Sequence, residues 1–246
     1  MKRVYVVDGL DPSGKVFAVE ARPAMQDAVS SPSTTSSSSS SSAAGSSSTS
    51  WSVGEMAMNV SVTSSSTVVV TCGRAAQLRE FTHDGELLRQ IALDPELVGA
   101  QHAVQLPPPA ASAAPADDDR FVVCHGWMDD ALHRVCVVDA AAGGPPTHVY
   151  GRQRGSASTN SLHNASHIAV DAPRQCVFVV DMGNRRVVAF DAALQLVADV
   201  PVKDKKRLPS RICLDDERAT LYVACNEWKD VFWTSGSVNV FRVSHK

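Results

Sequence analysis

The stretch CVFVVDMGNRRVVAFDAALQLV, from Cys176 to Val197, decides the fold. Two short runs rich in β-branched residues, VFVVD and RVVAF, flank a polar turn that carries Gly183 and Asn184. Short apolar runs separated by Gly, Asp and Asn are typical of paired β-strands. We therefore predict a β-hairpin over this stretch, with a further strand in the LQLVADV that follows.

The same hairpin recurs along the chain. Its other copies are TVVVTC with QLREFTHDGELLRQIAL, RFVVCHG with HRVCVVDA, and TLYVACNE with SVNVFRV. One strand precedes each pair, and an outer strand follows each of the first three pairs. A four-stranded antiparallel unit recurring at roughly 45–55 residues is the blade of a β-propeller. The sequence thus predicts an all-β fold, a β-propeller of four-stranded antiparallel blades, of which four to five are recognisable.

The predicted organisation has three parts. Residues 1–21 form an N-terminal strand pair, RVYVVDG and KVFAVEA, which would latch the propeller by completing a last blade that ends at its third strand. Residues 22–54 form an insert dominated by a serine tract, which has no means of burying apolar surface and should be disordered. Residues 55–246 carry the propeller blades.

Composition excludes some classes of partner. The net charge of −3 gives no overall attraction to nucleic acid, so we expect no binding of double-stranded DNA. No apolar run approaches the roughly 20 residues of a membrane helix, so no membrane partner is expected. The six cysteines occur singly, without a C-x-x-C pair, and are interpreted as reduced thiols. These features predict a cytoplasmic protein without a cofactor.

The residues also carry a family resemblance. SHIAVDAPRQCVFVVDMGNRRVVAFD resembles an NHL repeat, with matching residues at Asp181, Asn184, Arg186, Val187, Phe190 and Asp191. PSRICLDDERATLYVACNE with GSVNVFRV is a second match, which departs from the family where Cys225 replaces its Asp. The resemblance implies a propeller that usually has six blades, so the alternative to a latched ring is an incomplete propeller. In these residues the chain resembles the NHL domains of tripartite-motif-type proteins, which often select substrates in a ubiquitin-ligase pathway.

The polar turn is interpreted as structural. Asp181 and Asn184 can bond the backbone of the turn, Gly183 can supply a positive φ, and Arg186 can bond a carboxylate or a carbonyl. Arg185 should point away from Arg186 because side chains alternate along a strand. Arg185 is therefore the better candidate for a ligand contact.

Charge placement suggests a binding face. In a propeller, the turns between second and third strands and the connections between blades emerge on the same face. Basic residues and exposed aromatic rings on that face would bind a protein partner or, alternatively, single-stranded RNA. Carboxylates gather in the turns of the opposite face. The alternative is that the basic side chains only solvate their loops. The candidate ligand-binding residues are Arg74, Trp127, Arg152, Arg154, Arg185, Lys205, Lys206, Arg207, Trp228 and Lys229.

The resemblance leaves an enzymatic alternative. Some NHL-like propellers are metal-dependent lyases or hydrolases with a site on the central axis. His125, His133, His163 and His167 lie in or near neighbouring connections, and converging imidazoles would suit zinc. Their spacing is irregular, and the chain has no G-x-S-x-G, P-loop or H-E-x-x-H motif. We therefore predict a non-enzymatic binding scaffold, with no catalytic or metal-binding residue assigned.

Overall fold

The computed structural model describes residues 2–8, 13–21, 48–95, 99–108, 119–126, 132–141, 145–151, 161–202, 206–229 and 232–243. Within these ranges, no helix has the length and hydropathy needed to cross a membrane. The strands in chain order are β1 (Lys2–Asp8), β2 (Lys15–Ala21), β3 (Ser48–Ser52), β4 (Asn59–Val62), β5 (Val68–Cys72), β6 (Gln77–Phe81), β7 (Leu87–Ala92), β8 (Ala100–Leu106), β9 (Arg120–His125), β10 (Arg134–Asp139), β11 (His148–Tyr150), β12 (Ala165–Asp171), β13 (Cys176–Asp181), β14 (Arg186–Asp191), β15 (Leu196–Pro201), β16 (Arg207–Asp215), β17 (Thr220–Lys229) and β18 (Phe232–Arg242).

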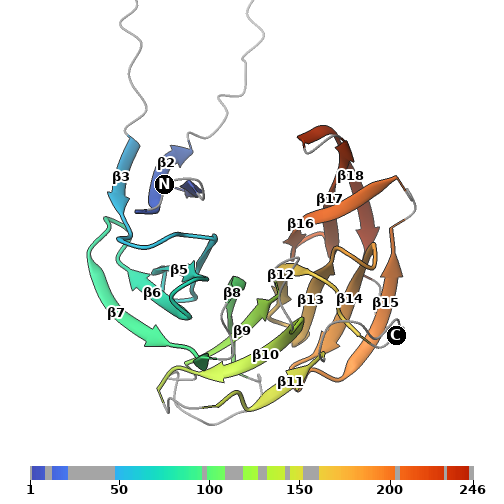
Figure 1. Ribbon diagram of the computed structural model, residues 1–246, viewed down its shortest axis with the longest axis horizontal. Helices are drawn as coiled ribbons and strands as arrows, with labels where there is room; N and C mark the ends of the chain where they lie inside the picture. The colour runs from blue at the N-terminus through green and yellow to red at the C-terminus, as the bar shows by residue number, and fades with distance from the viewer. Residues whose placement is uncertain are drawn as a thin grey trace, which may run out of the picture.

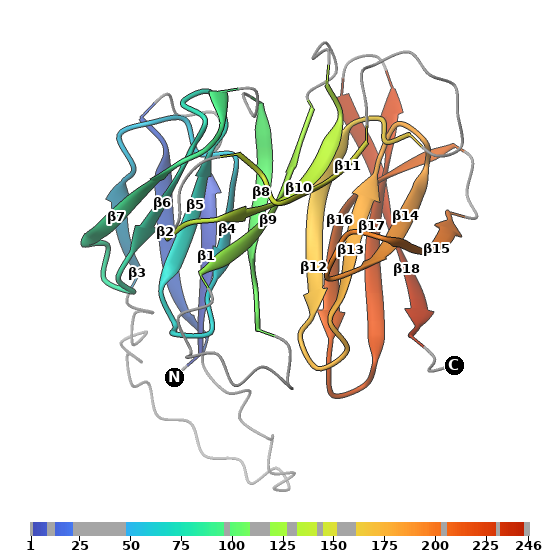
Figure 2. The same ribbon diagram turned by 90° about the horizontal axis from the view of Figure 1, so that it is seen from below.

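These strands form five antiparallel sheets, which we call blades 1 to 5. Blades 1 and 5 are the three-stranded sheets β1–β3 and β16–β18, and blades 2, 3 and 4 are the four-stranded sheets β4–β7, β8–β11 and β12–β15. Figure 1 shows the blades side by side in an arc, and Figure 2 shows their strands running along the arc's axis. The all-β propeller prediction is confirmed: the structure is a five-bladed β-propeller arrangement.

The core lies between neighbouring blades. The second strand of a central blade is buried on both faces, so it is a continuous apolar run rather than an alternating pattern. In β13, Val177 and Val179 pack toward blade 3, whereas Phe178 and Val180 pack toward blade 5. Similar apolar clusters join blade 1 to blade 2 and blade 2 to blade 3. Each blade is thus stabilised mainly by its neighbours.

Within the described residues, blade 1 has no counterpart of the first strand of the repeat. The carbonyl of Gly14, after β1, accepts a 2.9 Å hydrogen bond from Val53 on the connection that leads into β4. At the other end of β1, Arg3 bonds Asp84 in the turn between the third and fourth strands of blade 2. Both contacts place β1 and β2 in the roles that second and third strands have in blades 2 to 4.

Blade 5 has the first three strands of the repeat, and in the part of the chain that the structure describes β18 pairs only with β17. The N-terminal strands pair with β3, so β1 and β2 belong to a blade of their own rather than to the last blade. Strand β3, at Ser48–Ser52, lies inside the range 22–54 for which the sequence predicted an unstructured insert. Residues 22–47 lie outside the described residues.

Candidate functional site

The turns of the propeller emerge on two opposite faces. We call the one that carries the turns 73–76 and 182–185, between second and third strands, the b–c face. Arg74 and Arg185 lie in these turns, and Lys206 lies in the connection before β16. All three residues are exposed. The antiparallel topology therefore brings these three predicted cations to one face, as expected.

The other predicted ligand contacts are placed differently. Arg207 is half-buried at the start of β16. Trp228 and Lys229 lie on β17, where the backbone of Trp228 pairs with that of Trp233 of β18, so these two predicted contacts belong to a strand rather than to a turn. The structure does not describe four of the predicted contact residues, which are Trp127, Arg152, Arg154 and Lys205.

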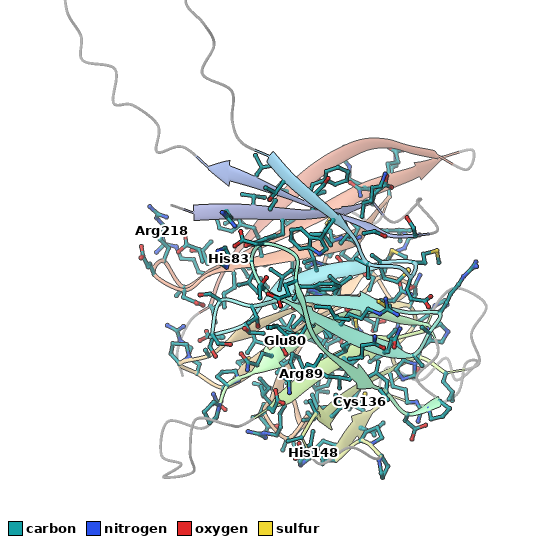
Figure 3. All side chains as sticks on the ribbon, turned by 90° about the vertical axis from the view of Figure 1, so that its left-hand side faces the viewer. Glu80, His83, Arg89, Cys136, His148 and Arg218 are labelled. Atoms are coloured by element: carbon teal, nitrogen blue, oxygen red, sulfur yellow. The ribbon has the colours of Figure 1, made fainter. Side chains whose placement is uncertain are left out.

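The opposite face carries carboxylates that are largely paired with arginines. Asp84 pairs with Arg3 at 3.0 Å and Asp215 with Arg218 at 2.8 Å. Figure 3 shows Arg89 beside Glu80, which it contacts at 2.6 Å while its guanidinium also contacts Asp119. By contrast, neither Arg74 nor Arg185 forms an ion pair within the described part of the chain. Among the described residues, Arg74 and Arg185 on the b–c face therefore present positive charge without a carboxylate partner.

The turn in the deciding stretch is a closed hydrogen-bond network. Asp181 is fully buried, and its carboxylate accepts bonds from the His163 backbone N–H at 2.7 Å, from Asn184 Nδ2 at 2.8 Å and from Arg186 Nε at 2.7 Å. Asn184 and Arg186 also donate to the carbonyl of Ser161. Because these side chains bond one another and the blade's own backbone, they hold the turn in place and offer no site to a ligand.

Two details of this turn differ from expectation. The residue with a positive φ is Arg185, at 57°, and not Gly183. Gly183 is required because a Cβ atom there would lie 2.4 Å from Nδ1 of His163. Arg186 is buried whereas Arg185 is exposed, as predicted, but Arg185 lies in the turn before β14 and not on the strand, so strand alternation is not the cause. The left-handed conformation thus holds the Arg185 side chain on the surface of the b–c face.

The four candidate histidines do not form a common metal site within the described residues. The rings of His133 and His163 meet edge to face at 5.3 Å, and Nδ1 of the buried His133 accepts a bond from the N–H of Asn164. His125 is fully buried, and burial lowers its pKa to about 3. His167 stacks on a histidine of another blade. Within the described ranges, no three His, Cys, Asp or Glu side chains are grouped so as to hold a metal ion.

A row of polar residues on the first strands was missed by the sequence reasoning. His102 on β8 and His167 on β12 stack with their ring centroids 4.1 Å apart. Nδ1 of His102 accepts from the N–H of Ile168, and Nδ1 of His167 accepts from that of Ile212, each in the following blade. Burial, followed by the charge of Arg211, lowers the pKa of His102 to about 3. Burial also lowers the pKa of His167 strongly.

This row has a signal in the sequence. The strands begin AQHAV, ASHIAV and PSRICL, so His102, His167 and Arg211 occupy one repeated position. A β-bulge precedes each of them, and each pairs across its blade with the second strand. Asn59 holds the same position in blade 2 and donates to the carbonyl of Gln101 in blade 3. Aligning first strands, rather than hairpins, would have found the row.

No family model and no curated protein matches the chain. The chain is similar in structure to a functionally unknown protein from Desulfotomaculum acetoxidans, with a TM-score of 0.53, 11% identity, and coverage of 95% of this chain and 66% of that one. A streptogramin B lyase (TM-score 0.48, 10% identity) and the β-propeller domain of Myceliophteria thermophila Cps50 (0.47, 14%) match over 76% and 77% of this chain, respectively, and each over 54% of its own. The chain thus spans less than two thirds of the length of these structures. At such identity, likeness concerns the fold alone, and NHL membership remains a resemblance in motif residues.

Proposed function

We propose that this chain is a non-enzymatic binding scaffold that holds an acidic segment of a protein partner on the b–c face. The observation that carries the proposal is the exposed pair Arg74 and Arg185, which have no ion-pair partner among the described residues, whereas Asp84, Asp215 and Glu80 on the opposite face are paired with arginines. Unneutralised cations on one face attract an anionic partner and orient it. The resemblance to NHL domains extends the proposal to substrate recognition in a ubiquitin-ligase pathway.

The test compares two faces of the same protein. Replacing both Arg74 and Arg185 with Gln is expected to weaken binding of a fluorescent peptide containing eight glutamates by roughly threefold to tenfold, because each exposed charge contributes up to about 1 kcal/mol. Arg185→Gln keeps a long side chain at a left-handed position that the arginine already tolerates, so folding should be unchanged. Affinity is measured by fluorescence anisotropy.

Arg218→Gln is the matched control, since Arg218 is exposed on the opposite face and pairs with Asp215. It should leave the affinity unchanged. A loss equal to that of the double variant would show nonspecific attraction and overturn the proposal. If a single-stranded oligouridylate binds more tightly than the peptide, with an affinity that falls steeply with salt, the partner is RNA instead.

A further inference from the structure

The first blade of the arc leaves one sheet face uncovered. Along β1 and β2 the side chains alternate, and Val16 and Ala18 pack into the cluster shared with blade 2 or are buried beside it. The other face carries Val4 and Val6, 53% and 51% exposed, opposite Val19 and Phe17. In blades 2 to 4 the corresponding faces are buried against the preceding blade.

The last blade, blade 5, leaves uncovered the face that points away from blade 4. Leu221 and Val223 of β17 are buried against blade 4. The alternate positions face away from blade 4, and there Val238 and Val240 of β18 are 61% and 59% exposed. They lie across from Ala224 and Tyr222 of β17. In blades 2 to 4 this side of the sheet packs on the following blade.

The row of first-strand residues that bond the next blade ends at blade 5, the blade with the uncovered face. Asn59, His102 and His167 each bond the backbone of the next blade. Arg211 holds the fourth position of the row, is exposed, and donates to the carbonyl of Ser210 in its own strand. Asp8 is exposed on the uncovered face of blade 1, at the end of the arc's axis where the first strands begin. Lys15 is also exposed on this face and lies across from Asp8, so the two uncovered faces are matched by their apolar side chains rather than by opposite charge.

We propose that a second copy of this chain covers these faces, with blade 5 of one copy packed on blade 1 of the next. The contact continues the series by which each blade packs on its successor, apolar face to apolar face. The two faces of one copy cannot cover each other, because blades 1 and 5 stand at opposite ends of the open arc (Figure 1). A contact between two different patches is heterologous, so each copy retains one free face and association continues with concentration.

The first measurement is sedimentation equilibrium of the full chain over a range of concentrations. We expect reversible association. A chain that remains monomeric at about 100 μM would overturn the proposal, because its association would then be weaker than almost any specific contact. Val6→Glu is expected to weaken the association at least about tenfold, because the contact would bury an unpaired carboxylate. Leu88→Glu, on the exposed outer strand of blade 2, is the matched control and should leave the association unchanged.

Disulfide trapping then tests which faces meet. In a Cys213→Ser background, which removes the exposed thiol of blade 5, Val6→Cys and Val240→Cys are placed in separate copies that carry tags of different size. Mild oxidation of the mixture should give the mixed dimer, whereas Leu88→Cys with Val240→Cys should not. A Val6→Cys copy that crosslinks only to itself would overturn the head-to-tail arrangement.

Discussion

Replacing Asp181 with Ala is expected to lower the free energy of unfolding by about 3–5 kcal/mol. The carboxylate is fully buried and accepts from His163, Asn184 and Arg186. Its loss leaves the buried Arg186 without its main counter-charge and two further donors without an acceptor. Urea unfolding followed by tryptophan fluorescence measures the difference.

Asp215→Ala is the control for this prediction. Asp215 bonds the backbone and side chain of Arg218 in a similar turn, but its partner is exposed. It should lower the free energy of unfolding far less than Asp181→Ala does, because water screens an exposed ion pair. Asp181→Asn keeps the shape and one acceptor oxygen, and should lie between the two. Equal losses of unfolding free energy for Asp181→Ala and Asp215→Ala would show that the buried network stabilises the fold no more than an exposed ion pair does.

The protein is also expected to lose stability steeply as the pH falls below about 6.5, the usual pKa of histidine. Burial lowers the pKa of His102 and of His125 to about 3, so both stay neutral in the folded state while the unfolded chain takes up protons. Stability is therefore complete above about pH 6.5 and declines toward about pH 3. Each histidine contributes a loss of up to about 1.4 kcal/mol per pH unit.

The contacts of the His102 ring also favour its neutral form in the folded state. Its Nδ1 atom accepts the Ile168 N–H, so a proton placed there would face another donor. The positive charge of Arg211 would also repel a protonated His102. Protonation of His102 is thus opposed by a lost hydrogen bond, by burial and by neighbouring charge.

His102→Asn tests this assignment. Asn59 occupies the equivalent position in blade 2, and an amide oxygen can accept from Ile168 without titrating. The variant should reduce the dependence of unfolding free energy on pH by about 1.4 kcal/mol per unit between about pH 6 and 4. Carboxylates contribute equally to both proteins and cancel. An unaltered slope in His102→Asn would refute the assignment.

The fold could be predicted because its signal is local and repeated. Runs such as VFVVD must be buried on both faces, and β13 is indeed buried throughout its central residues. The structural role of the turn could be predicted for a similar reason, since Asp181, Asn184 and Arg186 lie within a few residues of one another. Short sequence separation makes both inferences dependable.

What the sequence could not reveal depends on contacts between distant segments. Strand β3 reads STSWS and is apolar only at Trp51, whose ring packs between Tyr5 and Phe81. Its strand character comes from β2 and blade 2, and not from its own composition. The meeting of His102 with His167 likewise requires two blades to be in register, which no single repeat encodes. The position of Arg211 at the end of the row can be recognised only from the structure, because it depends on blade 5 being the last blade of the arc.

The open arc has a consequence for how the molecule comes apart. A closed ring has no ends, so loosening any blade breaks two interfaces between blades at once. In the open arc, blade 1 and blade 5 are each held by a single interface. Such a chain behaves thermodynamically like a short linear array, in which the terminal units fray first and the middle persists longest. Blade 3, with a partner on each side and another blade beyond each, should be the last to exchange its amide protons. The cooperativity of the whole therefore depends on whether its ends are covered.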